Sequence, residues 1–72
     1  MKVSAVIEKD ENGYYVYCPE LPGCQSQGDT LDECLENIKE AIDLYIETLT
    51  EEELKELTSK EILTTSLEVS VG

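Results

Sequence analysis

The residues best suited to chemistry are the cysteines of the stretch CPELPGCQSQGDT, which covers residues 18–30. Cys18 and Cys24 have five residues between them, and Cys34 follows further along the chain. A structural zinc site uses four ligands in closer pairs, and the chain has no histidine to complete such a set. A cysteine nucleophile would lack its imidazole base. We expect no metal site, no cofactor and no thiol catalysis. A reversible disulfide between Cys18 and Cys24 is a further alternative.

Carboxylates are the second group, because the chain has 17 acidic residues, 5 basic ones and a formal net charge of −12. Their spacing marks no general acid–base pair, which needs two carboxyl groups in unlike environments. A phosphate backbone would repel such a chain, so we expect no direct nucleic-acid binding. The charge serves either solubility or the docking of a basic protein. The carboxylates on the polar side of the helix predicted below are Asp32, Glu36, Asp43 and Glu47.

Three strands are predicted to precede that helix. Residues 2–10 alternate apolar and polar side chains, and Asn12-Gly13 is a strong hairpin signal. The second strand, residues 14–18, places Tyr15 and Tyr17 on one face, and the other face takes Tyr14, Val16 and Cys18. The short polar stretch CQSQG is expected to form a third, weaker strand.

One long helix is the clearest predicted element. Thr30 and Glu33 match a capping box, and about 19 residues of helical periodicity follow. Thr50 and Glu53 repeat the box and predict a short second helix. The apolar stripe of the long helix comprises Leu31, Cys34, Leu35, Ile38, Ala41, Ile42, Tyr45, Ile46 and Leu49.

The C-terminal residues are predicted to form a closing strand. Leu67, Val69 and Val71 alternate with Glu68 and Ser70. The element order is then β-β-β-α-(α)-β, an α+β fold whose antiparallel sheet has one main helix packed on one face. Since a terminal strand pairs within its own sheet or recruits a second copy, we expect Leu67, Val69 and Val71 to mediate self-association.

The loop between the second and third strands has two interpretations. Pro19 and Pro22 end the strand, and Gly23 allows a reversal of direction. The loop is then a connector that leads from a strand towards a helix. In the other interpretation, Glu20 and Leu21 lie at its tip and contact a partner.

Size and composition bound the remaining possibilities. The 72 residues suffice for one small domain, which often gains stability by oligomerising. No leader or long apolar run is visible, so we expect no membrane association. Three cysteines are an odd number, which favours a reducing cytoplasm over a disulfide framework.

The stretch GYYVYCPELPGCQSQGDTLDECLENIKEAI resembles the signature of the HicB antitoxin family. That signature has a tyrosine-led strand, then P-[DE]-L-P-G-C, then Q-G-D-T-x-x-E-A and N-x-x-E-A-I. Cys34 replaces the usual alanine. The matching residues are Pro19, Glu20, Leu21, Pro22, Gly23, Cys24, Gln27, Gly28, Asp29, Thr30, Glu33, Asn37, Glu40, Ala41 and Ile42.

The resemblance implies a fold like part of RNase H and a non-enzymatic function. HicB-like antitoxins bind and occlude HicA, a small basic toxin that cleaves mRNA. Longer members add a DNA-binding domain, so the expectation here is a single HicB-like domain over residues 1–72 without one. The alternatives are an oligomeric interaction module without a toxin and, more remotely, a degenerate nuclease. We expect a homodimer or homotetramer, and the predicted partner-binding residues are Tyr15, Tyr17, Glu20, Leu21, Asp32 and Glu36.

Overall fold

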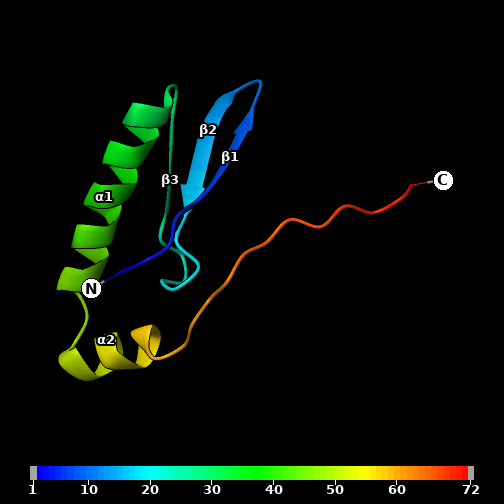
Figure 1. Cartoon of the computed structure of the whole chain (residues 1–72). Coiled ribbons are helices and arrows are strands. Elements are labelled where there is room, and N and C mark those ends of the chain that lie inside the picture. Colours follow the sequence, from blue (N-terminus) through cyan, green and yellow to red (C-terminus); the bar gives the residue numbers. More distant parts are fainter. Residues whose placement is uncertain (1, 72) are drawn as a thin grey trace.

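The computed structural model describes residues 2–71 and has an α+β fold in which a three-stranded antiparallel sheet packs against a helix. The strands lie in the order β1-β2-β3, and α1 packs on β3 and β2 (Figure 1). Met1 and Gly72, which the single-domain prediction includes, lie outside the described residues. The elements are β1 (Val6–Asp10), β2 (Gly13–Tyr17), β3 (Gln25–Gly28), α1 (Leu31–Glu47) and α2 (Glu51–Thr58).

The β1–β2 hairpin forms as predicted, with its turn one residue earlier. Asp10 pairs with Gly13, so Glu11 and Asn12 are the turn residues. The Asp10 carboxylate accepts a hydrogen bond of 2.8 Å from the Asn12 N–H, which is an Asx turn. Gly13 has φ +132°, a value that disfavours any side chain. The glycine therefore begins β2 and is not a central turn residue.

The core lies between the sheet and α1. Its buried residues come from β2, from the loop between β2 and β3, and from α1. The alternation of side chains along β2 predicted which face of that strand is buried. Ile7, on the edge strand β1, stays 40% exposed because α1 covers β2 and β3. The buried hydrophobic residues are Val16, Cys18, Leu21, Cys24, Cys34 and Ile38.

Both predicted helices form, and their N-termini differ. In α2 the Thr50 hydroxyl accepts from the Glu53 N–H while the Glu53 carboxylate accepts from the Thr50 N–H, a complete capping box. Hydrogen bonding of the Glu53 carboxylate to Thr50 lowers the pKa of Glu53. In α1 the Thr30 hydroxyl accepts from the Glu33 N–H at 3.1 Å. The Glu33 side chain lines a pocket and does not form the second hydrogen bond of a capping box.

The PELPG loop is a structural connector, and the prediction that Glu20 and Leu21 lie at its tip is wrong. The Leu21 N–H donates to the Cys18 carbonyl and the Cys24 N–H to the Leu21 carbonyl, at 3.1 and 3.0 Å. This turn directs Leu21 inward, where its exposure is 0%. Glu20 is also buried, and its carboxylate accepts from the Ser4 N–H at 3.0 Å. Burial alone would raise the pKa of Glu20, but the Ser4 hydrogen bond lowers it on balance.

The predicted closing strand is not formed within residues 2–71. The chain after Ser59 is irregular and extends away from the sheet (Figure 1). Leu67, Val69 and Val71 are 82%, 77% and 94% exposed. A strand requires hydrogen bonds to a neighbour, and this segment runs beside none. The likeness to part of RNase H, which included a later strand, stays a prediction.

Candidate functional site

The up-and-down order of the elements brings two predicted motifs to one end of the molecule. The β1–β2 turn and the β3–α1 connection both lie at the top of Figure 1. Each contributes acidic side chains, and the first turns of α1 add more. We call this group the acidic end, and it consists of Asp10, Asp29, Asp32, Glu33 and Glu36.

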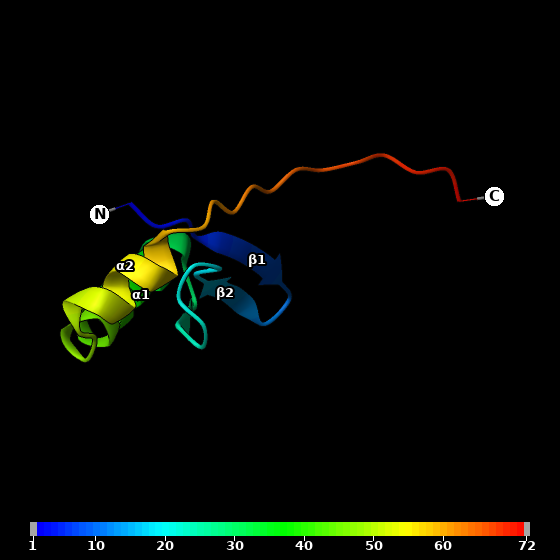
Figure 2. The ribbon, with the colours of Figure 1, turned by 90° about the horizontal axis from the view of Figure 1, so that it is seen from below.

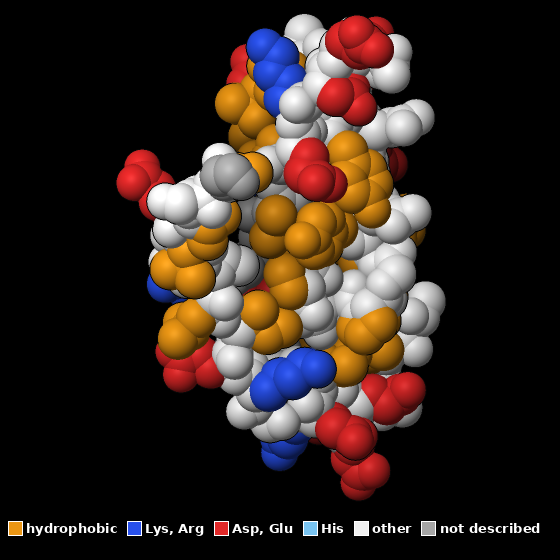
Figure 3. All heavy atoms as spheres, turned by 90° about the vertical axis from the view of Figure 1, so that its right-hand side faces the viewer, with side chains coloured by type: hydrophobic (Ala, Val, Ile, Leu, Met, Phe, Trp, Pro, Cys, Tyr) orange, Lys and Arg blue, Asp and Glu red, His pale blue; other side chains and the backbone are white. Residues whose placement is uncertain are grey.

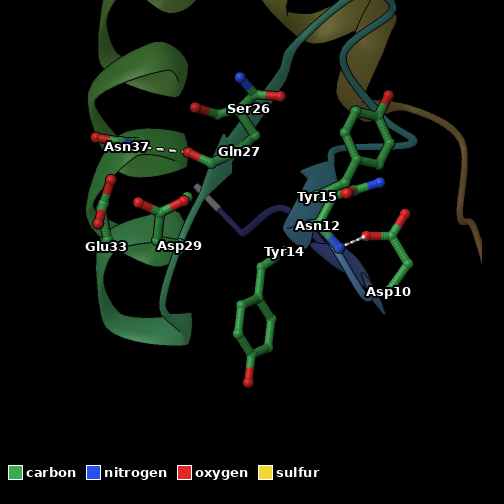
Figure 4. Close-up of a pocket in the computed structure, with 11 residues that line it drawn as sticks. Asp10, Asn12, Tyr14, Tyr15, Ser26, Gln27, Asp29, Glu33 and Asn37 are labelled. Atoms are coloured by element: carbon green, nitrogen blue, oxygen red, sulfur yellow. Dashed lines mark hydrogen bonds between the residues drawn. The ribbon is translucent and has the colours of Figure 1, made fainter.

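A pocket of about 480 Å³ opens at the acidic end. Figure 4 shows Asp29 and Glu33 on one side of it, Asp10 and Asn12 on the other, and Tyr14 between them. Carboxylates from the β1–β2 turn, the β3–α1 connection and α1 therefore line one pocket. The full lining is Asp10, Asn12, Gly13, Tyr14, Tyr15, Ser26, Gln27, Gly28, Asp29, Glu33 and Asn37.

Local contacts fix the floor of this pocket. The Asn37 side-chain amide donates to the Gln27 carbonyl at 2.8 Å, which ties α1 to β3 (Figure 4). A Cβ on Gly28 would lie 2.6 Å from the Cys34 nitrogen, so only glycine allows this close approach of strand and helix. Lys9 is the cation beside the pocket, with its ammonium 5.5 Å from the centroid of the Tyr14 ring.

The sheet face opposite α1 carries a pair of tyrosines. The rings of Tyr15 and Tyr17 have centroids 6.0 Å apart and planes tilted by 35°. The Tyr15 hydroxyl donates to the Gln25 side chain at 2.8 Å, and Tyr17 is 37% exposed. Large tilted rings that keep a polar end suit a protein interface. We call Tyr15, Tyr17 and Gln25 the tyrosine face.

The surface on the side of the hairpin and the C-terminal segment carries both hydrophobic and acidic side chains. Figure 3 shows hydrophobic side chains gathered in its middle, while acidic side chains lie mainly around them. Exposed apolar residues on the described chain include Ile7, Tyr17 and those of the C-terminal segment. An apolar centre with a polar rim is the usual anatomy of a protein-binding surface.

Four of the six predicted partner-binding residues lie at the surface, and the other two are buried. Tyr15 and Tyr17 lie on the exposed sheet face, and Asp32 and Glu36 lie exposed on α1. Glu20 and Leu21 are buried in the connector.

Sequence reasoning missed part of the pocket, although the hairpin turn and the Thr30 cap together signalled it. An up-down-up-down chain must bring those two connections to one end. The missed residues are Asp10, Asn12, Tyr14, Asp29, Glu33 and Asn37.

The three cysteines are buried in the core. Cys18 and Cys24 continue the β2–β3 register, and the Cys18 N–H donates to the Cys24 carbonyl at 3.0 Å. Burial and the adjacent Cys24 thiol raise the pKa of Cys18 to about 11, so its thiol stays protonated near neutral pH. Within residues 2–71, three or more histidine, cysteine or acidic side chains do not gather closely enough to hold a metal ion. The helices of that range are also too short or too polar to span a membrane.

Comparison with known proteins gives the class of the chain. The model of a family described as HicB-like antitoxin of bacterial toxin-antitoxin system matches residues 3–69. This match covers nearly the whole chain, including the connector, the pocket and α1. The chain therefore belongs to the HicB-like antitoxin family.

Several known proteins are similar in sequence to this chain. A protein of Helicobacter pylori named UPF0150 protein is 49% identical over 70 residues, which is 97% of each chain. An Archaeoglobus fulgidus UPF0150 protein is 60% identical over 48 residues, covering 65% of this chain and 70% of that protein. A 14.9 kDa protein of Haemophilus phage HP1 is 51% identical over 47 residues, which is 65% of this chain and 35% of the phage protein. No solved structure matches this chain significantly.

Proposed function

We propose that this protein is the antitoxin of a type II toxin–antitoxin system, and that it binds and occludes a small basic, HicA-like toxin that cleaves mRNA. The observation that carries the proposal is the pocket at the acidic end, where Asp10, Asp29 and Glu33 line a cavity next to Tyr14. Family membership supports a toxin as the partner.

The mechanism is electrostatic attraction followed by steric masking. A net charge of −12 attracts a cationic protein and accelerates the encounter. The pocket then accepts a lysine or arginine side chain, because the carboxylates that line it pair with the cation. The tyrosine face supplies apolar contact area that slows dissociation. Binding hides the toxin's active site, and the antitoxin performs no chemistry.

This function sets further expectations for the protein. It acts in the cytoplasm, where mRNA is available to the toxin. It makes no direct contact with nucleic acid, since its charge opposes phosphate. It is a homodimer or homotetramer in which Leu67, Val69 and Val71 contribute to self-association, because these residues expose apolar surface.

Charge reversal within the pocket tests the proposal. The gene product encoded beside this protein, if small and basic, is purified and its association rate is measured at low salt. Asp29→Lys with Glu33→Lys should lower that rate by at least about tenfold. Asp43→Lys with Glu47→Lys is the matched control, because it changes the net charge equally on the later half of α1.

The control pair should reduce the rate less, and circular dichroism should show both variants folded. Equal rates for the two double variants would show that the pocket has no special role. Failure of the wild-type protein to capture the neighbouring basic protein in a pull-down would contradict the antitoxin function itself.

A second candidate is a stand-alone oligomeric interaction module without a toxin. The exposed Leu67, Val69 and Val71 favour it, because they suit self-association more directly than binding of a cation. The absence of any small basic gene beside this one would support this candidate.

A further inference from the structure

We propose that the C-terminal segment Leu67–Val71 of one copy adds as a strand to the free edge of β1 in a second copy. The inference concerns self-association and does not depend on a toxin. It follows from an unpaired sheet edge and an unpaired apolar segment in the same small chain. Addition of an extended segment to such an edge is a common mode of recognition.

The register of the hairpin identifies the groups that β1 offers. In an antiparallel pair, alternate residues direct both backbone groups toward the neighbouring strand. The pair that closes the two-residue turn, Asp10 and Gly13, is hydrogen-bonded. Glu8 and Val6 therefore also face β2, whereas Ile7 and Lys9 direct their N–H and C=O groups outward. The outer edge of β1 thus presents two donors and two acceptors.

The other edge of the sheet is less available. By the same alternation, Gln25 and Gln27 direct their backbone groups outward from β3. The Gln27 carbonyl already accepts the Asn37 side chain at 2.8 Å. The helix α1 also packs closely on β3. The outward backbone groups of β1 are therefore free to bind an incoming strand, whereas those of β3 are partly occupied.

The C-terminal segment has the properties of the missing strand. Its apolar side chains alternate with Glu68 and Ser70, and all of the apolar ones are at least 77% exposed. Exposed apolar side chains at this spacing favour burial on one face of a sheet. Ile7, 40% exposed on β1, provides apolar surface at the proposed edge.

The position of the segment points to a second copy as the acceptor. Ile62 and Leu63 lie near Lys2 and Ser4, which precede β1. Beyond them the chain turns away from its own β1 and runs outward (Figures 1 and 2). An outward segment on each of two copies permits a reciprocal exchange with two-fold symmetry, which buries both segments and covers both edges.

Proline substitutions that leave the monomer's own hydrogen bonds intact test the exchange. Lys9→Pro removes an outward donor only, because the β1–β2 hydrogen bonds involve neighbouring residues. Glu68→Pro with Val69→Pro removes a donor from the segment, whichever residue faces the edge. Each should raise the dimer dissociation constant at least about tenfold, because each removes a hydrogen bond from both exchanges of the symmetric dimer. Lys9→Ala and Glu68→Ala with Val69→Ala are the matched controls, and light scattering after size exclusion is the readout.

Mixing the two proline variants gives the decisive result. The Lys9→Pro chain keeps an intact segment, and the other variant keeps an intact edge, so one exchange can form between them. Native mass spectrometry should detect more of this heterodimer than of either variant's homodimer at the same protein concentration. Amide exchange at Ile7 and Lys9 should be slow in the wild-type dimer and fast in the Glu68→Pro with Val69→Pro chain.

Three results would overturn the proposal. The first is a wild-type protein that stays monomeric with fast exchange at Ile7 and Lys9. The second is a monomer in which those amides are protected at every concentration, because the segment then folds back on its own β1. The third is a dimer that persists unchanged in both proline variants. All of these readouts are independent of toxin binding, so failure here removes the proposed self-association through the C-terminal segment but leaves the proposal of toxin binding standing.

Discussion

At the scale of single residues, the family signature divides into residues that shape the fold and residues that face solvent. Glu20 and Leu21 shape the connector: one accepts the Ser4 N–H and the other fills the core. Gly28 allows the contact between β3 and α1. Asp29 and Glu33 line the pocket. Substitutions within one short motif should therefore have different effects on stability and on binding.

The buried carboxylate Glu20 predicts a pH-dependent stability. Its pKa in the folded protein lies below the ordinary value of 4.5. The contribution of the ionised group is therefore complete above that value and is lost as the pH falls through the folded pKa. Glu20→Gln keeps an acceptor for Ser4 but loses the charge, which should cost about 1 kcal/mol at pH 7.

The measurement for Glu20 is the free energy of unfolding in urea between pH 7 and pH 3. The difference in the free energy of unfolding between wild type and Glu20→Gln should become smaller as the pH falls below 4.5. Comparing two chains removes the general effect of protonating other carboxylates. A gap that is constant over this range would contradict the role given to the charge.

Gly28, at the end of β3, and Gly23, in the connector, predict an order of stability. Gly28→Ala would bring a Cβ to 2.6 Å from the Cys34 nitrogen, a backbone atom that cannot move cheaply, so we expect a loss of about 2–3 kcal/mol. Gly23→Ala is the matched substitution in open space, where only φ +82° is unfavourable and the loss should be about 1 kcal/mol. Thermal unfolding should rank Gly28→Ala below Gly23→Ala, and the reverse order would refute the close-approach argument.

At the scale of elements, β2 serves two purposes through its alternating faces. Val16 is fully buried against α1, whereas Tyr17 on the opposite face is more than a third exposed. This five-residue strand thus contributes one face to the core and the other to the exposed surface. Substitutions one residue apart should separate stability from partner affinity.

This separation gives a direct test on β2. Val16→Ala should lower the free energy of unfolding by about 2 kcal/mol and leave the affinity of the folded protein for its partner nearly unchanged. Tyr17→Ala should cost less stability than Val16→Ala, because Tyr17 is partly exposed, and should weaken partner binding at least about tenfold, mainly through faster dissociation. Both quantities are measured by urea unfolding and surface plasmon resonance. Similar losses of affinity in both variants would contradict the assignment of the faces.

Elements with strong local signals could be predicted from the sequence. The hairpin, α1 and α2 follow from turn residues, helical periodicity and caps, which act over a few residues. The inward direction of Leu21 could not be predicted, because hydrogen bonds among Cys18, Leu21 and Cys24 set it. The pocket also depends on two connections far apart in the sequence. The segment Leu67–Val71 has a strand pattern, but a pattern cannot supply the neighbour that a strand needs.

At the scale of the whole molecule, charge and shape support the same account. A chain of net charge −12 with an acidic pocket at one end and the exposed Tyr17 on one sheet face is suited to binding a basic protein. Long-range attraction of this kind weakens as salt rises, because ions screen it over about 10 Å at 0.1 M. The complex should therefore form more slowly at high salt, while its dissociation depends on the contacts of the tyrosine face.

The most direct measurement of the central claim is growth rescue in cells that express the neighbouring small basic protein. If this chain masks a toxin, that protein alone should arrest growth, and co-expression of this chain should restore it. Asp29→Lys with Glu33→Lys should rescue poorly at equal protein levels, whereas Asp43→Lys with Glu47→Lys should rescue nearly as well as wild type. Continued arrest despite abundant, folded wild-type protein would contradict the account.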